Sequence, residues 1–165
     1  MMIISSLLFA DILYANPSPL GIELNKSTLD DVKKSYRIVT SNQNEGYYYN
    51  VLDVQNVPIE TLSRIILVSN SKNIIEVVLI ELSKDKFDET YKMLSSKYKV
   101  LSSELPFVGD KYAKLQDGDC HILINAPHMS FTTSVMYTTK DFENKYHDRA
   151  DKEQAAKQEQ TKELL

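Results

Sequence analysis

The chain has 165 residues, of which 42% are hydrophobic and 25% are charged, a composition typical of a globular protein with one packed domain. Its formal net charge of −4 leaves no surplus of lysine and arginine for neutralising phosphates, so the composition argues against a nucleic-acid partner. The single cysteine, Cys120, excludes an internal disulfide.

The first fifteen residues, MMIISSLLFADILYA, are largely apolar and are followed by NPSPL, which cannot continue a helix. Such a run is too short to span a bilayer, and Ala15 is a small residue at a cleavage point, so residues 1–15 are predicted to be a signal peptide. The absence of a basic residue before the run, and Asp11 within it, favour the alternative of a buried N-terminal helix or strand. Export predicts a periplasmic or secreted protein whose mature chain has no integral membrane segment.

A segment near the start of the mature chain returns later in the sequence. The run GIELNKSTLDD (21–31) matches LIELSKDKFDE (79–89) with five identities, each 58 positions apart. The identical residues of the first copy are Ile22, Glu23, Leu24, Lys26 and Asp30. Self-similarity at a fixed spacing indicates a repeated structural unit, and two copies suit a tandem duplication that shares one core. Acidic residues at the end of each copy favour the N-terminus of a helix.

Three strand-like runs follow each predicted helix. They cover residues 47–54, 64–69 and 74–82 in the first repeat, and 111–116, 120–125 and 131–139 in the second. Turn residues between the runs predict hairpins and therefore an antiparallel sheet. The predicted fold is α+β: a tandem αβββ duplication (about residues 20–78 and 79–139) that forms one antiparallel sheet, with the helices packed on one face of the sheet. Residues 16–147 form a single domain in this prediction.

The chain is expected to end in a helix. Phe142 and Tyr146 stand at i, i+4 spacing after the last strand, where they can cover the core. Residues 148–165 are polar, and both a solvated helix and a disordered tail are consistent with their composition.

No motif of catalysis or cofactor binding is present. The sequence has no G-x-S-x-G, Walker or GxGxxG motif, and His121, His128 and His147 lack the spacing of a helical zinc pair. Alternation along a strand turns Cys120 inward and His121 outward, which predicts a buried structural thiol. We therefore expect a protein that is not an enzyme, with no catalytic residue, metal site or cofactor. A small hydrolase that uses His128 or a carboxylate pair is the least favoured alternative.

Two features favour a binding protein. Tyr47 and Tyr49 share one face of a predicted strand, and tyrosine is favoured at protein interfaces, although such residues also cover helices and sheet edges. Two proline-containing loops, 56–62 and 125–131, carry apolar residues and are expected at equivalent corners of the repeats, either as contact sites or as plugs folded into the core. The candidate partner-binding residues are Tyr47, Tyr49, Val57, Ile59, His128 and Met129.

The run ELNKSTLDDVKKSYRI (23–38) resembles the helix-opening segment of the BamE/SmpA-like outer-membrane assembly lipoproteins and of the related β-lactamase inhibitor proteins. In that fold a small helical segment precedes three antiparallel strands, and in the inhibitors the unit is tandemly duplicated. Asn25 stands where the pattern has glycine, and the lipid-bearing cysteine is absent, so no functional residue is carried over. The resemblance implies a non-catalytic envelope protein, inhibitor-like or assembly-like, that binds a macromolecular partner. The alternative is a module that holds a sugar or lipid over the tyrosine-rich strand.

Overall fold

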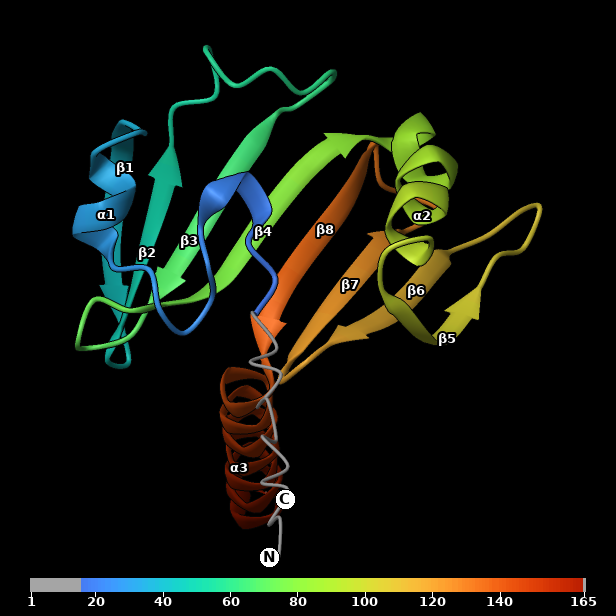
Figure 1. The fold of residues 1–165 in the computed structure, drawn as a ribbon. Helices are drawn as coiled ribbons and strands as arrows, with labels where there is room; N and C mark the ends of the chain where they lie inside the picture. The colour runs from blue at the N-terminus through green and yellow to red at the C-terminus, as the bar shows by residue number, and fades with distance from the viewer. Residues whose placement is uncertain (1–15, 165) are drawn as a thin grey trace, which may run out of the picture.

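The computed structural model describes residues 16–164 of the chain, and the signal peptide predicted at residues 1–15 lies outside this range (Figure 1). The helical elements are η1 (Pro19–Gly21), α1 (Leu29–Lys33), η2 (Lys84–Lys86), α2 (Phe87–Ser95) and α3 (Lys140–Leu164). The strands are β1 (Ile38–Asn44), β2 (Tyr47–Leu52), β3 (Arg64–Ser69), β4 (Ile75–Ser83), β5 (Lys99–Glu104), β6 (Lys111–Asp117), β7 (Cys120–Ala126) and β8 (Thr132–Thr139). Within residues 16–164, no helix combines the length and the apolarity needed to cross a bilayer.

All eight strands join one antiparallel sheet in the order β1-β2-β3-β4-β8-β7-β6-β5, which confirms the α+β class. Strands β4 and β8 pair at the centre, so the last strand of each half lies against the last strand of the other half (Figure 1). The central position of β4 agrees with its almost continuous run of apolar β-branched residues, which suits a strand buried on both faces.

Each half of the sheet contains four strands after its helix, so the predicted order of one helix and three strands is wrong. The missing strands are the two edges, β1 and β5, whose sequences IVTSNQN and KVLSSE are polar and almost entirely exposed. Because an edge strand buries little on either face, it carries no apolar alternation that would mark it in a sequence. Each edge also has a register shift, at Ile38/Thr40 and at Val100/Ser102, and such bulges discourage pairing with another chain.

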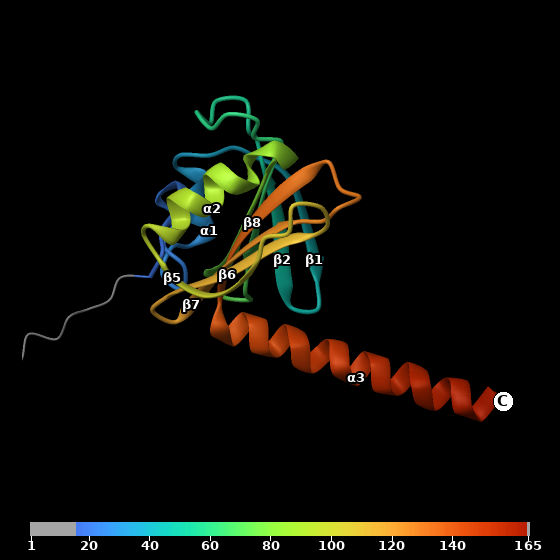
Figure 2. The ribbon, with the colours of Figure 1, turned by 90° about the vertical axis from the view of Figure 1, so that its right-hand side faces the viewer.

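Helices α1 and α2 cover one face of the sheet, as predicted (Figures 1 and 2). A capping box starts α1: the Thr28 side chain accepts from the Asp31 backbone N–H, while the Asp31 carboxylate accepts from the Thr28 backbone N–H. In α2, Phe87 and Leu94 lie two turns apart and are buried in the main core. Burial of Phe87 alone stabilises the fold by roughly 1.5 to 3 kcal/mol relative to an exposed side chain.

The C-terminal helix, which the prediction named apart from the helices of the two repeats, lies on the opposite face of the sheet (Figure 2). Figure 2 shows α1 and α2 on one side of the sheet and α3 running away on the other side. Phe142, in the first turn of α3, is buried in a separate apolar cluster with Val68 and Val77. From Ala150 to Lys162 the helix is exposed, so the polar segment forms a solvated helix rather than a disordered tail.

The two copies of the sequence repeat have different local structures. Residues 79–83 belong to β4, whereas residues 21–24 lie over the core without joining the sheet, although Leu24 and Leu82 are both buried. Asn25 adopts a φ of 61°, in the left-handed region that favours glycine and admits asparagine better than most residues. Asparagine at position 25 therefore fits a backbone conformation that most residues other than glycine disfavour.

Candidate functional site

The face of the sheet opposite α1 and α2 carries a row of aliphatic side chains. We call Val51, Ile66, Leu79, Met136 and Leu123 the aliphatic row. They stand on β2, β3, β4, β8 and β7 and are joined by direct cross-strand pairing: Val51 with Ile66, Ile66 with Leu79, Leu79 with Met136, and Met136 with Leu123. Their chain neighbours point into the main core, so alternation along each strand turns the row to the other face. All five side chains are half-buried.

An apolar groove of about 330 Å³ lies between the aliphatic row and α3. It is lined by Tyr49, Ile66, Val68, Val77, Leu79, Met136, Phe142 and Tyr146. None of these side chains is charged, and the tyrosine hydroxyls are the only polar side-chain groups among them. The groove therefore suits an apolar side chain or a small apolar ligand.

A second groove, of about 370 Å³, lies on the other flank of the first turns of α3. It shares Met136, Phe142 and Tyr146 with the apolar groove, but it also contains charged and polar groups. Its remaining lining residues are Tyr112, Lys114, Leu123, Thr138, Glu143 and His147. We call the face of the sheet opposite α1 and α2 the uncovered face, because, of the helices within residues 16–164, only the start of α3 packs on it (Figure 2). The start of α3 divides this face into an apolar side and a mixed side.

The two predicted tyrosines both lie on this face, beside α3. The Tyr47 ring packs edge-on against Phe142, with centroids 5.1 Å apart, and the Arg149 guanidinium carbon lies 5.2 Å from the Tyr47 ring centroid. Burial raises the pKa of Tyr47 above its ordinary value. Tyr47 therefore supports a helix, which is the alternative considered from the sequence, whereas Tyr49 lines the apolar groove.

Tyr112 was not among the predicted site residues, although it lines the second groove. It pairs across the sheet with Asn125 and lies on β6, two strands away from the central strand β8. Alternation within the predicted strand 111–116 places Tyr112 on the face opposite Ala113 and Leu115. Only the pairing of strands that are distant in sequence shows that Tyr112 lies on the same face of the sheet as Tyr49.

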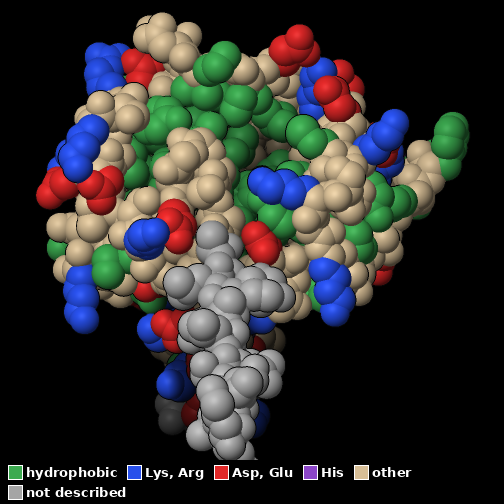
Figure 3. Space-filling model, in the orientation of Figure 1, with side chains coloured by type: hydrophobic (Ala, Val, Ile, Leu, Met, Phe, Trp, Pro, Cys, Tyr) green, Lys and Arg blue, Asp and Glu red, His purple; other side chains and the backbone are tan. Residues whose placement is uncertain are grey.

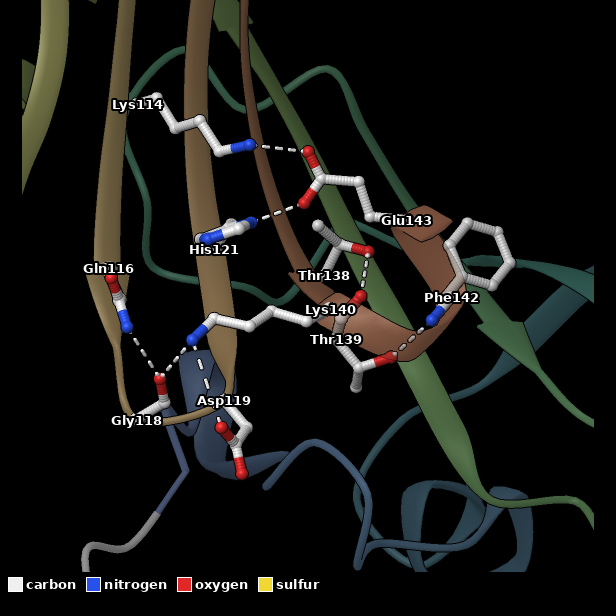
Figure 4. A network of polar contacts seen from close by, with 10 residues as sticks. All are labelled: Lys114, Gln116, Gly118, Asp119, His121, Thr138, Thr139, Lys140, Phe142 and Glu143. Carbon is white, nitrogen blue, oxygen red and sulfur yellow. Dashed lines mark hydrogen bonds and ion pairs between the residues drawn. The ribbon is translucent and has the colours of Figure 1, made fainter. Parts of the chain in front are cut away.

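A network of polar contacts holds the first turn of α3 on the sheet (Figure 4). The Glu143 carboxylate accepts from Lys114 Nζ at 2.6 Å and also contacts His121 Nδ1. Burial by itself raises the pKa of Glu143, but the hydrogen bonds with His121 and Lys114 outweigh this effect and lower the pKa below its ordinary value. At the helix start, Thr139 Oγ1 accepts from the Phe142 backbone N–H at 3.1 Å, and Lys140 Nζ donates to the Gly118 carbonyl.

The two proline-containing loops do not connect equivalent strands, which corrects the prediction of equivalent corners. The first joins β2 to β3, the second and third strands of its half, and the second joins β7 to β8, the third and fourth. Both loops nevertheless flank the end of β4. The Ser83 backbone N–H donates to Thr61 Oγ1 at 3.3 Å, and the Lys84 backbone N–H donates to the Phe131 carbonyl at 3.1 Å.

The apolar residues of these loops have opposite environments. Val57 and Ile59 are half-buried and pack against the main core, which is the arrangement of a plug. Met129 and His128 are exposed, and the His128 backbone N–H donates to the Asp110 carboxylate. The predicted set of partner-binding residues is therefore divided between the uncovered face, the core and an exposed loop.

The side chains considered for catalysis also lie apart. Cys120 is fully buried on the core side of β7, and burial raises its pKa to about 11, so the predicted structural thiol is confirmed. His121 points to the opposite face, where it contacts Glu143. Among residues 16–164, no three His, Cys, Asp or Glu side chains are grouped in a way that could hold a metal ion.

No protein-family model, no curated protein and no solved structure matches this chain. The resemblance to the assembly lipoproteins and β-lactamase inhibitors stays a prediction from the sequence.

Proposed function

We propose that this protein is a non-catalytic binding module, exported to the periplasm or secreted, that holds a protein partner on the uncovered face of its sheet. The aliphatic row is the observation that carries the proposal. Five solvent-accessible aliphatic side chains in direct register across five strands form a contiguous apolar surface, whereas apolar residues on a surface without a partner are usually scattered.

The surroundings of the row resemble the anatomy of an interface. A neighbouring row of Arg64, Glu81, Ser134 and Asn125 is polar, and these residues are also joined by cross-strand pairing. Protein interfaces commonly have an apolar centre with a polar rim, and tyrosine is enriched among the residues that contribute most to affinity. Tyr49 and Tyr112 stand on the two sides of the row, in the grooves where a partner side chain could insert.

A tandem duplication would explain why the row continues across both halves of the sheet. Leu79 and Met136 pair at the centre of the sheet and stand 57 positions apart, as do their outer neighbours Ile66 and Leu123. This spacing is close to the 58 positions of the sequence repeat. The next residues along the row are Val51, which pairs with Ile66 in the first half of the sheet, and Lys114, which pairs with Leu123 in the second half. The proposed interface is therefore apolar throughout the first half and is bounded by a lysine in the second half.

The proposal is tested by capture with protein from Asn16 onward, immobilised and exposed to envelope extract. Leu79→Glu places a carboxylate at the centre of the aliphatic row, and Met93→Glu places the same group on the exposed surface of α2, on the other side of the sheet. We expect a protein that is retained by the unaltered chain and by Met93→Glu but is lost with Leu79→Glu. Binding should then be reproduced with the purified partner. If Leu79→Glu retains the same proteins as the unaltered chain, the uncovered face is not the binding surface.

A second candidate is a small-ligand module, which the uncharged lining of the apolar groove favours. A lining without charged groups suits an acyl chain better than a sugar, because a sugar requires several hydrogen-bonding partners. A fatty acid that displaces the apolar dye 1-N-phenylnaphthylamine from the protein, but not from Tyr49→Lys, would support this candidate. Absence of dye binding would count against it.

A further inference from the structure

Two loops with uncharged tips adjoin at the end of the sheet where β4 runs into α2. Residues 105–110 (LPFVGD) connect β5 to β6, and residues 127–131 (PHMSF) connect β7 to β8; apart from Asp110, at the end of the first loop, neither run contains Asp, Glu, Lys or Arg. The loops are linked by the hydrogen bond from the His128 backbone N–H to Asp110 Oδ1, at 2.5 Å. We call residues 84–89, 104–111 and 126–131 the loop-tip surface.

Four apolar side chains project from these tips into solvent. Phe107 is fully exposed, and Phe131, Met129 and Val108 are 92%, 89% and 71% exposed. None of the four belongs to either apolar cluster of the described chain. In Figure 3 a hydrophobic side chain stands out from the right-hand edge, at the position of the β5–β6 loop. One exposed phenylalanine would be unremarkable, but four such side chains on two linked loops form an unsatisfied apolar surface.

The charges around the tips are predominantly negative. The loop-tip surface contains three lysines against five carboxylates, those of Asp85, Asp88, Glu89, Glu104 and Asp110. The lysines are already engaged within the protein. Lys84 donates to the Pro127 and His128 carbonyls, Lys86 pairs with Glu89 and Glu60, and Lys111 pairs with Asp88.

A pocket of about 340 Å³ lies between the start of α2 and the β5–β6 loop. Its apolar walls are the side chains of Phe87, Phe107, Val108 and Ala126, and its other lining residues are Lys84, Asp85, Asp88, Gly109, Lys111 and His128. Lys111 pairs with Asp88, and Lys84 donates to the Pro127 and His128 carbonyls. Within the described chain, Asp85 has no lysine, arginine or histidine at ion-pair distance. The Asp85 carboxylate accepts a hydrogen bond from Ser83 Oγ but has no ion-pair partner among the described residues. Such a carboxylate beside apolar walls matches a lysine or arginine side chain, which has an aliphatic stem and a cationic head.

We propose that the loop-tip surface is a second docking surface, which binds a cationic protein segment with apolar residues beside its lysine or arginine. The cationic side chain enters the pocket toward Asp85, and the apolar neighbours cover Phe107 and Phe131. The charge pattern selects this occupant, because an anionic lipid surface would be repelled by the same carboxylates. The surface lies at one end of the sheet and shares no residue with the aliphatic row.

The test uses two fluorescently labelled peptides with the same leucine positions, one with lysine and one with glutamate at every polar position. Binding is measured by fluorescence anisotropy with the unaltered protein, with Phe107→Ser/Phe131→Ser, and with Asp85→Lys. Met93→Ser is the matched control, because Met93 is an exposed apolar residue on the outer surface of α2. All the substituted side chains are exposed, so the variants should keep the stability of the parent, which urea unfolding verifies.

We expect the lysine peptide alone to bind, and its affinity to fall by about tenfold or more in the double phenylalanine variant. Asp85→Lys should weaken binding and reduce its dependence on salt between about 0.05 M and about 0.5 M NaCl, while Met93→Ser should bind as the parent does. Equal binding of the two peptides, or unchanged affinity in the double variant, would overturn the proposal. Binding to phosphatidylcholine vesicles that the double variant abolishes would also overturn it, because the tips would then insert into lipid. Loss of capture by Leu79→Glu concerns only the aliphatic row, so the two proposals fail independently.

Discussion

Replacement of Phe142 with alanine is the most direct test of how α3 is held on the sheet. Phe142 is 8% exposed and packs with Val68 and Val77, the apolar residues beneath the first turn of the helix. Phenylalanine-to-alanine changes in protein cores cost about 3 to 5 kcal/mol, which includes the penalty for the cavity. Because this cluster opens into a groove that water can fill, we expect a loss near the lower end of that range, about 3 kcal/mol.

The edge-on contact between Phe142 and Tyr47 contributes a further share of this loss. Aromatic pairs of this geometry are worth about 0.5 to 1.5 kcal/mol beyond the area that they bury. The free energy of unfolding is measured in urea for the parent, for Phe142→Ala and for Tyr146→Ala, the adjacent aromatic residue, which is 56% exposed. We expect the Tyr146 variant to lose less than about 1 kcal/mol. Equal losses in the two variants would refute the conclusion that Phe142 anchors the helix.

Three further predictions concern single residues. The pKa of Glu143 is lowered in the folded state, so its contacts stabilise the fold at pH values above its ordinary pKa of 4.5. This contribution disappears as the pH falls through the lower pKa of the folded state. The free energy of unfolding in urea should therefore decrease between about pH 7 and about pH 3, and the decrease should be smaller in Glu143→Gln. Cys120 is buried and its pKa is raised to about 11, so a thiol reagent at neutral pH should modify it only when the protein unfolds locally or globally. The rate of thiol modification should therefore rise steeply in urea. Immediate modification without urea would contradict the buried position. Because Asn25 has a φ of 61°, Asn25→Gly should leave the stability nearly unchanged, whereas Asn25→Val should lower it by about 1 to 2 kcal/mol. Thermal unfolding of the two variants measures the difference, and equal stability of both would contradict the left-handed backbone at this position.

The interior strands and the starts of the two short helices could be predicted from the sequence, because their signals are local. Strand β4 is apolar over most of its length, and β7 alternates from Cys120 onward, so each pattern reveals a strand and its buried face. Thr28 and Asp31 mark the start of α1 through the spacing of a capping box. The edge strands β1 and β5 could not be predicted in this way, since an exposed polar strand and a loop have similar sequences.

The candidate site was predicted only in part. Tyr47 and Tyr49 were predicted because alternation along one strand places both on the same face. The aliphatic row was not predicted, because its five members come from five strands and are adjacent only in the sheet. Phe107 and Phe131 are apolar residues in loop segments that contain proline or lack charged residues, and this pattern is visible in the sequence. The sequence does not show, however, whether such a side chain points outward or packs into the core as Val57 does.

The sequence by itself determined the class of the fold, the interior strands, the starts of the two short helices and the burial of Cys120, because periodicity and capping act between residues that are close in the chain. The tertiary structure alone decided that Phe142 turns α3 onto the uncovered face and that Leu79 meets Met136 at the centre of the sheet. It also decided which proline loop folds inward and which one presents Met129 to solvent. These features depend on the register between segments far apart in the chain, and register is set by the packing of all eight strands together rather than by any one of them.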